Sequence, residues 1–460
     1  MLKRMNKHFV QIRIGGVKVI AKKLKSLFYL LLQTPIYLIS IPLIIILRLI
    51  KSWYLIRWGE LISSRIGHFC INTELYCCKR DVGINSPSQK YLDLFYMRKF
   101  VCNKQLDKMW KRSLIVLPAW LLRPLSRVNR FFCLFISSFK EHECGYPDGI
   151  LNHKPDLINK FPAHISFTDK EELKGKEILK KFGLAKDAKF VCLLVRDAGY
   201  LNRHAKDEYM DKRWLYHNYR DGDIDNYVLA AEELAKRGYY VFRMGKNVLK
   251  PLKSSNLKII DYANSEMSND FMDIYLSAKC SFFISTAAGL DGIAVIFRRP
   301  IAYTNYVSFG LMGQKYSNNN RTLSLTKHHI NKKTQQELTI SEIFSANVAL
   351  AYRTEEYKLN DIILEENTPE EIRDLVIEMD ERLSGRWKDT KEDLLLQKRF
   401  WSIVNDEIRR LEIKPTKDGF PIGNRIWIHR MAVDKVRSRQ GKMKARYGAK
   451  FLRENQNWIR

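Results

Sequence analysis

The sequence predicts an α/β protein whose principal domain is a doubly wound parallel sheet, preceded by a basic, membrane-associated N-terminus. Three observations lead to this prediction. Short apolar runs alternate with amphipathic segments between residues 185 and 330, a spacing typical of strand–helix–strand units. Residues 190–195 are apolar throughout, as in a parallel strand that is covered on both faces. Residues 27–47 contain no charged side chain and are long enough to cross a bilayer core as a helix.

The positive charge of the chain is concentrated at its two ends. The 460 residues are enough for two or three domains, and the formal net charge is +29. Residues 1–59 contain eleven Lys or Arg and no acid, and residues 425–460 contain eleven against two acids. Such ends suit an anionic membrane surface or nucleic acid. Because we find no zinc-finger spacing, RNA-binding signature or helix-turn-helix pattern in the sequence, we do not expect nucleic acid as a partner.

The uncharged segment 27–47 is interrupted by Pro35 and Pro42, and basic residues flank it on both sides. The positive-inside tendency places both flanks in the cytoplasm. A re-entrant or interfacial helix satisfies that placement better than a single span, which stays the alternative. The segment is too long, and starts too late, for a cleaved signal peptide. We therefore expect the protein at the cytoplasmic face of the inner membrane.

The cysteines point to neither a disulfide nor a metal. The eight cysteines form no CxxC pair and match no zinc spacing. Cys192 and Cys280 lie within apolar runs, where cysteine serves as a small buried residue in a reducing compartment.

A first α/β domain is expected directly after the membrane segment. Its elements, in order, are a strand at 53–58, a polar glycine-containing turn at 63–68, a helix at 69–80, a strand at 92–97, a helix at 103–112 and a strand at 114–117. A further helix follows at 168–182, where Thr168 and Glu171 form a capping box and Gly183 ends the helix.

The alternation of strands and helices is clearest in the second α/β domain. Its expected elements are strands at 190–195, 239–243, 258–262, 280–285 and 301–303, with helices at 226–237, 269–277 and 289–297. The remainder is predicted to be mostly helical, with one helix starting at Thr368 and Pro369. Four regions are therefore predicted. They are a membrane segment at 1–52, a first α/β domain at 53–184, a second, ligand-binding α/β domain at 185–345 and a helical C-terminal region with a basic tail at 346–460.

Polar residues follow several of the predicted strands. In open parallel sheets, ligands bind at the carboxyl ends of the strands. Arg196 and Arg243 could hold diphosphate oxygens in bidentate fashion, and the turn 285–289 opens a helix whose amides suit a phosphate. The candidates for donor binding are Arg196, Asp197, Arg243, Gly245, Ser285, Thr286, Gly289 and Asp291. The alternative for each is structural: a solvated or paired arginine, or a simple N-cap.

Three residues are candidates for a catalytic base. His217 and Asp221 lie on a long polar loop after the first strand of the second domain, and long loops of this kind are often functional. The alternative is a surface loop tied by Asp–Arg pairs. His68, after Gly67, is the third candidate, although an isolated histidine is more often structural.

Several of these segments together resemble a family of bacterial glycosyltransferases found among surface-polysaccharide genes. The segments that carry the likeness are 64–69, 72–75, 102–106, 196–197, 200–201, 217–221, 243–245, 273–276, 297–300, 366–371 and 451–453. The resemblance implies a cleft between two Rossmann-like domains, a GT-B-like fold, without metal dependence. Gly67 and His68, with Arg65 and Asn72, look like the acceptor-side loop of such enzymes.

The second domain is also similar to the donor site of GDP-fucose-using transferases at Arg196 and the turn 285–289. It departs from them because no histidine precedes Arg196, which puts fucose in doubt as the donor.

The resemblance and the strand-end residues together predict a glycosyltransferase. It would use a nucleotide sugar as substrate, without a cofactor, and a lipid-linked or surface-polysaccharide acceptor. The alternatives are a sugar-nucleotide epimerase of similar two-domain fold and a non-enzymatic, membrane-bound scaffold of polysaccharide biosynthesis.

Overall fold

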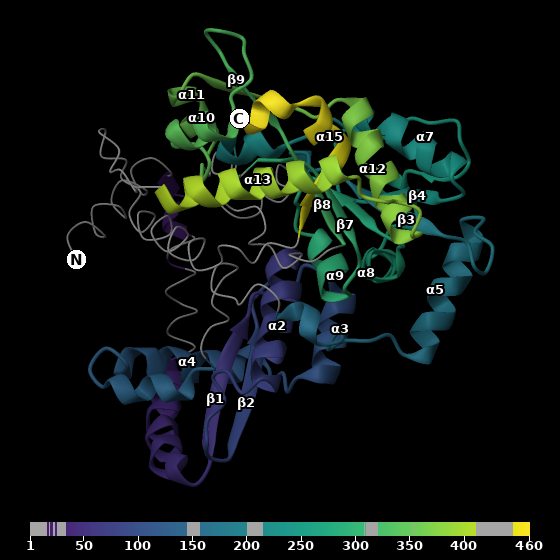
Figure 1. Cartoon of the computed structure of the whole chain (residues 1–460). Helices are drawn as coiled ribbons and strands as arrows, with labels where there is room; N and C mark the ends of the chain where they lie inside the picture. Colours follow the sequence, from purple (N-terminus) through teal and green to yellow (C-terminus); the bar gives the residue numbers. More distant parts are fainter. Residues whose placement is uncertain are drawn as a thin grey trace. The chain divides into compact units, whose positions relative to one another are not determined.

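The computed structural model describes residues 16–17, 19–21, 24, 34–144, 157–199, 215–307, 309, 321–351, 353–410 and 445–460 (Figure 1). The chain forms two compact units, which are described separately. The N-terminal unit consists of Met1–Leu61, Asn85–Lys99 and Leu114–Tyr146, and the main unit of Ile62–Ile84, Phe100–Ser113 and Pro147–Arg460. Most of the predicted basic tail lies outside the described residues.

The main unit is built on a seven-stranded parallel sheet. The strand order is β11-β8-β7-β6-β3-β4-β5, and every pair of neighbours is parallel. The strands are β3 (Phe190–Leu194), β4 (Tyr240–Arg243), β5 (Ile259–Ile260), β6 (Phe283–Ser285), β7 (Ile301–Tyr306), β8 (Thr322–Thr326) and β11 (Arg446–Tyr447). The predicted α/β class with a large parallel sheet is confirmed.

The order of the strands defines a switch point in the sheet. The chain proceeds outward from β3 to β4 and β5, and then returns to place β6 on the opposite side of β3. Crossovers that leave in opposite directions create a crevice outside the carboxyl ends of the two strands. The carboxyl ends of β3 and β6 are therefore where a ligand is expected in a sheet with this strand order.

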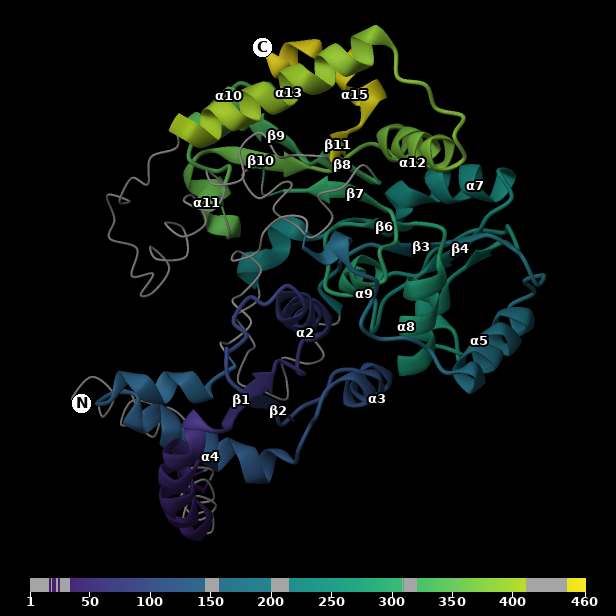
Figure 2. The same ribbon diagram turned by 60° about the horizontal axis from the view of Figure 1, so that its bottom comes forward.

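Helices cover both faces of this sheet. Figure 2 shows α7 and α12 on one face and α8 and α9 on the other. The helices of the main unit include α2 (Ile66–Asp81), α3 (Lys104–Ser113), α5 (Asp169–Lys181), α7 (Val228–Lys236), α8 (Asp270–Lys279), α9 (Asp291–Ile296), α10 (Ile340–Ser345), α11 (Thr354–Leu359), α12 (Pro369–Leu383), α13 (Lys391–Arg410) and α15 (Ala449–Glu454). The capping box predicted at Thr168 is present, and the helix predicted to start at Thr368 also begins with a capping box.

The described part of the C-terminal region is mostly helical, as predicted, and it also contributes two short strands. β10 (Ile362–Glu365) pairs antiparallel with β9 (His328–Asn331). β11 extends the main sheet, and the Tyr447 hydroxyl lies 2.9 Å from the Thr326 hydroxyl of β8. A two-residue strand has no periodicity of its own, because it forms only against a partner that is distant in the sequence.

The N-terminal unit contains a two-stranded parallel sheet of β1 (Leu55–Leu61) and β2 (Tyr91–Met97). A buried ion pair between Arg57 and Asp93, at 2.6 Å, joins the two strands. The strand predicted at 114–117 is reduced to a single bridge at Val116. The described residues of this unit therefore do not form a second Rossmann-like sheet.

The helix predicted after the first strand belongs to the main unit. All residues of α2 from Phe69 to Cys78 are buried, and a Cβ placed on Gly292 of α9 would lie 2.6 Å from the Cys70 sulfur. Such close packing requires a glycine. A helix that is buried all round needs more cover than two strands provide, which explains its place in the larger unit.

One helix among the described residues, Thr34–Ser52, is long and apolar enough to cross a membrane, with a mean hydropathy of 1.8. Its described part begins at Thr34, runs through Pro42 without a break and ends in the 3₁₀ turn η1 (Ile50–Ser52). A break just before Pro35 would fall outside the described residues. One side packs on β1, β2 and α4 (Ala119–Phe132) through a cluster that contains Ile44, Trp58 and Tyr96.

Gly175 in α5 lies against the Tyr275 ring of α8, and a Cβ there would come within 2.1 Å of the ring. Alanine normally stabilises a helix by about 1 kcal/mol relative to glycine. At this position we expect the reverse for Gly175→Ala, a loss of about 1–3 kcal/mol from overpacking, measured by urea unfolding. The double variant Gly175→Ala/Tyr275→Leu should recover part of the loss. A more stable single variant would contradict the packing.

Candidate functional site

The turns after β3 and β6 are bonded to each other at the switch point. The Arg196 amide donates to the Thr286 hydroxyl at 2.9 Å, and the Thr286 amide donates to the Leu194 carbonyl at 3.2 Å. Two of the segments that the sequence predicts to bind a ligand are therefore neighbours in the fold. Their proximity follows from the strand order, because β3 and β6 pair directly.

The Arg196 guanidinium is largely buried and binds residues of the 3₁₀ segment η4 (Leu215–Arg220) and its end. It forms an ion pair with Asp221 and donates to the His217 carbonyl at 3.0 Å. Burial lowers the pKa of Arg196, with Asp221 acting in the opposite direction. Burial also raises the pKa of Asp221. Asp221, a candidate base, and Arg196, a candidate phosphate-binding residue, are thus paired with each other in the structure.

Two further cations and one further acid complete what we call the switch-point cluster. Lys327, directly after β8, donates to the Asp221 carbonyl at 2.6 Å, and the Arg220 guanidinium donates to the Ala287 carbonyl. Glu366 interacts electrostatically with Lys327, whose pKa is lowered by burial. The cluster consists of Arg196, Arg220, Lys327, Asp221 and Glu366. Asp197 also acts electrostatically on Arg196 and Asp221, so three cations meet three acids here. An anionic ligand would bind by displacing an acid from one of the cations.

Glu366 is held by three donors from two segments, η5 (Ile224–Tyr227) with its N-cap and β7. The Asp223 amide donates to it at 3.0 Å, the Asn226 amide group at 3.1 Å and the Asn305 amide group at 3.3 Å. Asn305 has a φ of 51° at an irregularity in β7 and exchanges two 2.7 Å hydrogen bonds with Asn367. The polar side chains at the carboxyl edge of the sheet are therefore held in place by a network of hydrogen bonds.

The turn 285–289 is shaped by its own hydroxyl. Ser285 Oγ donates to Asp291 at 3.0 Å and accepts from the Ala287 amide at 3.0 Å. Ala287 has a φ of 62°, a conformation that is rare for a residue with a side chain and that clusters at functional sites. Ser285 and Asp291 thus hold the turn in position, and the Ala287 amide is already occupied.

The start of α2 packs directly on this turn. A Cβ on Gly67 would lie 3.2 Å from the Gly289 Cα, so the two glycines allow the backbones to touch. His68 follows, half-buried, with its Nδ1 atom 3.4 Å from the Asn72 side-chain amide. Arg65 is exposed at the N-cap of α2. The predicted acceptor-side loop and the predicted donor-side turn are therefore brought together within the main unit.

Arg243, Asp197 and Gly245 have structural roles. Arg243 is 1% exposed and contacts Asp261 at 3.3 Å and Asp197 at 3.8 Å. Asp197 also accepts from the amides of Gly199 and Leu249, both at 2.9 Å. Gly245 has a φ of 143°, which favours glycine. These residues hold the loop after β4 in position. Contact between them and a ligand stays a prediction.

His217 is 4% exposed, and its ring lies 6.1 Å from that of Tyr219. Its backbone carbonyl accepts a hydrogen bond from the Arg196 guanidinium. Its burial favours a structural role over that of a base that meets an acceptor. Of the three base candidates, His68 is the one that is neither buried nor in an ion pair with Arg196.

Glu74, Cys78 and His164 place three possible metal ligands within 4.8 Å of one another. The group is already balanced by charge. Glu74 is fully buried and pairs with Arg298 at 2.5 Å and with His164 at 3.0 Å, and His164 also pairs with Asp81 at 2.7 Å. Burial lowers the pKa of His164, but hydrogen bonds to Cys78, Glu74 and Asp81 outweigh it and raise the pKa to about 10. We interpret the group as an ion network that ties α2 to the turn before β7.

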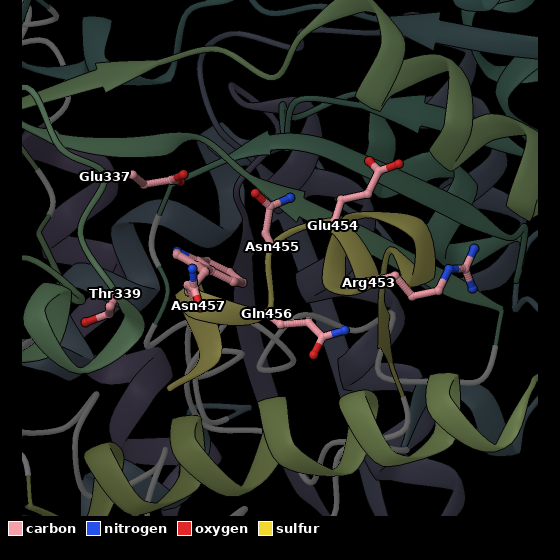
Figure 3. Close-up of a pocket in the computed structure, with 8 residues that line it drawn as sticks. Glu337, Thr339, Arg453, Glu454, Asn455, Gln456 and Asn457 are labelled. Carbon is pink, nitrogen blue, oxygen red and sulfur yellow. The ribbon is translucent and has the colours of Figure 1, made fainter.

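A separate depression of about 360 Å³ lies beside the C-terminal segment (Figure 3). It is lined by Glu337, Thr339, Arg453, Glu454, Asn455, Gln456, Asn457 and Trp458. It shares no residue with the switch-point cluster, and Arg453 is held in an ion pair with Asp393 of α13.

Comparisons with known proteins give similarity at the level of the fold. No protein-family model matches the sequence, and no curated protein sequence matches it. The structure is similar to the ADP-heptose LPS heptosyltransferase II of E. coli, with 11% identity, a TM-score of 0.33, and coverage of 54% of this chain and 84% of that one. It is also similar to a glycosyl transferase family 9 protein of Veillonella parvula, with 11% identity, a TM-score of 0.37, and coverage of 71% and 96%.

Lys327, Glu366 and Arg220 were not among the residues predicted from the sequence. Lys327 follows Thr322–Thr326, whose alternating threonine, leucine and serine residues are a strand signal. Glu366 follows β10, which is similarly short. Recognising β8 adds Lys327 to the residues at the carboxyl ends of the parallel strands, whereas β10 belongs to a separate antiparallel pair and gives no such signal for Glu366.

Proposed function

We propose that the protein is a glycosyltransferase that uses a nucleotide-sugar donor. The observation that carries the proposal is the switch-point cluster, in which three cations meet acids at the carboxyl edge of a parallel sheet. A diphosphate that enters this site would take over the guanidinium of Arg196 from Asp221. Stabilising the charge that develops on a leaving nucleotide is the main contribution expected of such a site. The resemblance in the sequence supports the same reaction.

The acceptor side of the proposed reaction lies at the start of α2. His68 follows the glycine that contacts the Gly289 turn, and we propose it as the base that deprotonates the acceptor hydroxyl. Asp221 is the second candidate, because its carboxylate could accept the proton of the acceptor hydroxyl only after its ion pair with Arg196 is broken. The reaction would need no cofactor or metal.

We propose a lipid-linked or surface-polysaccharide acceptor at the cytoplasmic face of the inner membrane. The apolar helix Thr34–Ser52 and the acid-free N-terminal 59 residues support association with an anionic membrane surface.

The test is to incubate the purified full-length protein with a panel of sugar nucleotides, with and without a lipid-linked acceptor extract. Acceptor-dependent release of nucleotide is expected, together with a higher melting temperature in the presence of the true donor. Conversion of the sugar without acceptor would instead indicate an epimerase. Neither binding nor turnover of any donor would favour a scaffold.

A further inference from the structure

The N-terminal unit presents a second apolar surface besides the helix Thr34–Ser52. α4 ends in a hydrogen-bonded turn, residues 131–136, in which three large apolar side chains point outward: Phe131, Leu134 and Phe135 are 59%, 77% and 72% exposed. The turn is ordered, because the Leu134 amide donates to the Phe131 carbonyl at 3.1 Å and the Ile136 amide to the Phe132 carbonyl at 2.9 Å. Soluble proteins rarely fix such residues together in contact with water.

This turn lies beside the apolar helix. Phe132 and Cys133 pack on the cluster that contains Ile44, Leu43 and Leu47 of the helix. The Arg48 guanidinium donates to the Ser138 carbonyl at 2.9 Å and lies 4.5 Å from the centre of the Phe139 ring. Both views show α4 lying next to this helix (Figures 1 and 2).

The helix itself has two different apolar sides. Ser40 and Ile44 are buried against the unit, whereas Leu38, Ile46 and Leu49 are exposed. The side that packs shares a core with Trp58 and Tyr96 of the small sheet. A helix crossing the bilayer at right angles would take this core with it, whereas a helix lying in one leaflet places only its exposed side in lipid.

Basic side chains accompany the second surface. Residues 114–140 contain four basic residues and no acid. Arg127 is exposed and bonds to the Tyr37 hydroxyl of the helix, and Arg130 is half-exposed next to Glu143. Trp120 and Leu121 are exposed at the start of α4. Apolar side chains with cations beside them complement an anionic bilayer, whose headgroups attract the cations and whose acyl boundary takes the rings.

We propose that the N-terminal unit is a monotopic membrane wedge, in which the turn 131–136 and the exposed side of the helix Thr34–Ser52 insert together into one anionic leaflet. The occupant of this surface is the lipid bilayer. The proposal deepens the membrane association within the proposed function, and it is independent of the transfer chemistry in the main unit.

The test is vesicle flotation of the full-length protein with phosphatidylglycerol/phosphatidylethanolamine vesicles and with phosphatidylcholine vesicles. The variant Phe131→Ser/Leu134→Ser/Phe135→Ser should reduce partition at least about tenfold. The variant Arg127→Gln/Arg130→Gln/Lys140→Gln should weaken the preference for anionic vesicles without removing it, because the eleven Lys and Arg of residues 1–59 remain. The matched control is Leu394→Ser/Leu395→Ser on α13, where two similarly exposed leucines should be replaced without effect.

Three outcomes would overturn the proposal. The serine variant could float like the wild type. It could lose binding no more than the Leu394/Leu395 control. It could convert a lipid-free dimer to a monomer in light scattering, which would make the surface a contact between two copies. Because the three replaced side chains are exposed, folding should be unchanged. Donor binding by the serine variant, followed by melting temperature, should equal that of the wild type, which separates failure of this proposal from failure of the proposed function.

Discussion

Replacing Arg196 by glutamine should lower the rate of sugar transfer by about 10²–10³-fold, the cost of removing one preorganised donor at a developing negative charge. Glutamine keeps a hydrogen-bond donor toward the His217 carbonyl, so the segment that follows should stay in place. Arg196→Lys keeps the charge but loses the planar guanidinium, so its transfer rate should lie between those of the wild type and Arg196→Gln. The measurements are initial rates with saturating acceptor and donor affinity by calorimetry.

The matched control for this prediction is Arg237→Gln. Arg237 also binds two segments, through ion pairs with Glu233 at 2.8 Å and Asp380 at 2.9 Å. It lies between α7 and the start of β4, at the amino edge of the sheet. Its replacement should cost stability without changing donor affinity. Equal loss of donor affinity in the two variants, or undiminished transfer by Arg196→Gln, would remove Arg196 from the donor site.

Replacing Glu74 by glutamine should have the largest effect on stability, a loss of about 3–5 kcal/mol in the free energy of unfolding. The carboxylate is fully buried, and its removal leaves Arg298 and the charged His164 without their shared anion. Chemical denaturation of the full-length protein measures the loss. Glu172→Gln is the control, because Glu172 pairs with Lys279 at a half-exposed site, where about 0–1 kcal/mol is expected.

The same network should make stability depend on pH. The pKa of His164 is raised to about 10 in the folded protein, against roughly 6.5 in an unfolded chain. A group with a raised pKa contributes its full stability below the unfolded value and loses it as the pH rises through the folded value. The wild type should therefore lose stability from about pH 6.5 toward pH 10, and Glu74→Gln should lose less over that range. A parallel decline in both proteins would show that His164 is not charged by this network.

The fold of the main unit could be predicted where an element shows its own periodicity. β3, β4 and β6 are runs of apolar residues, and the capping residues Thr168 and Thr368 fixed two helix starts. β11 could not be found this way, since two residues show no period. The assignment of α2 to the main unit also escaped prediction, because it depends on the contact between Cys70 and Gly292 and not on local pattern.

The position of the candidate site could be predicted from the sequence, but the pairing of its side chains could not. Strand order brings Arg196 next to Thr286, as expected for residues at the carboxyl ends of paired strands. Which arginine faces a ligand depends on its surroundings: Arg243 lies between Asp261 and Asp197 in the interior, whereas Arg196 lies among other cations. The sequence around the two arginines is equally polar, so composition alone does not distinguish them.

The pairing of β11 with β8 has a consequence for how the chain folds. Arg446 pairs with Leu323, 446 − 323 = 123 positions earlier in the chain. Closing so long a loop has an entropic cost, so we expect this pairing to form after the rest of the sheet. Until then β8 is an open edge with unpaired backbone groups, the feature through which partly folded chains associate. Docking of the final segment therefore ends the period in which a newly made chain is most exposed to aggregation.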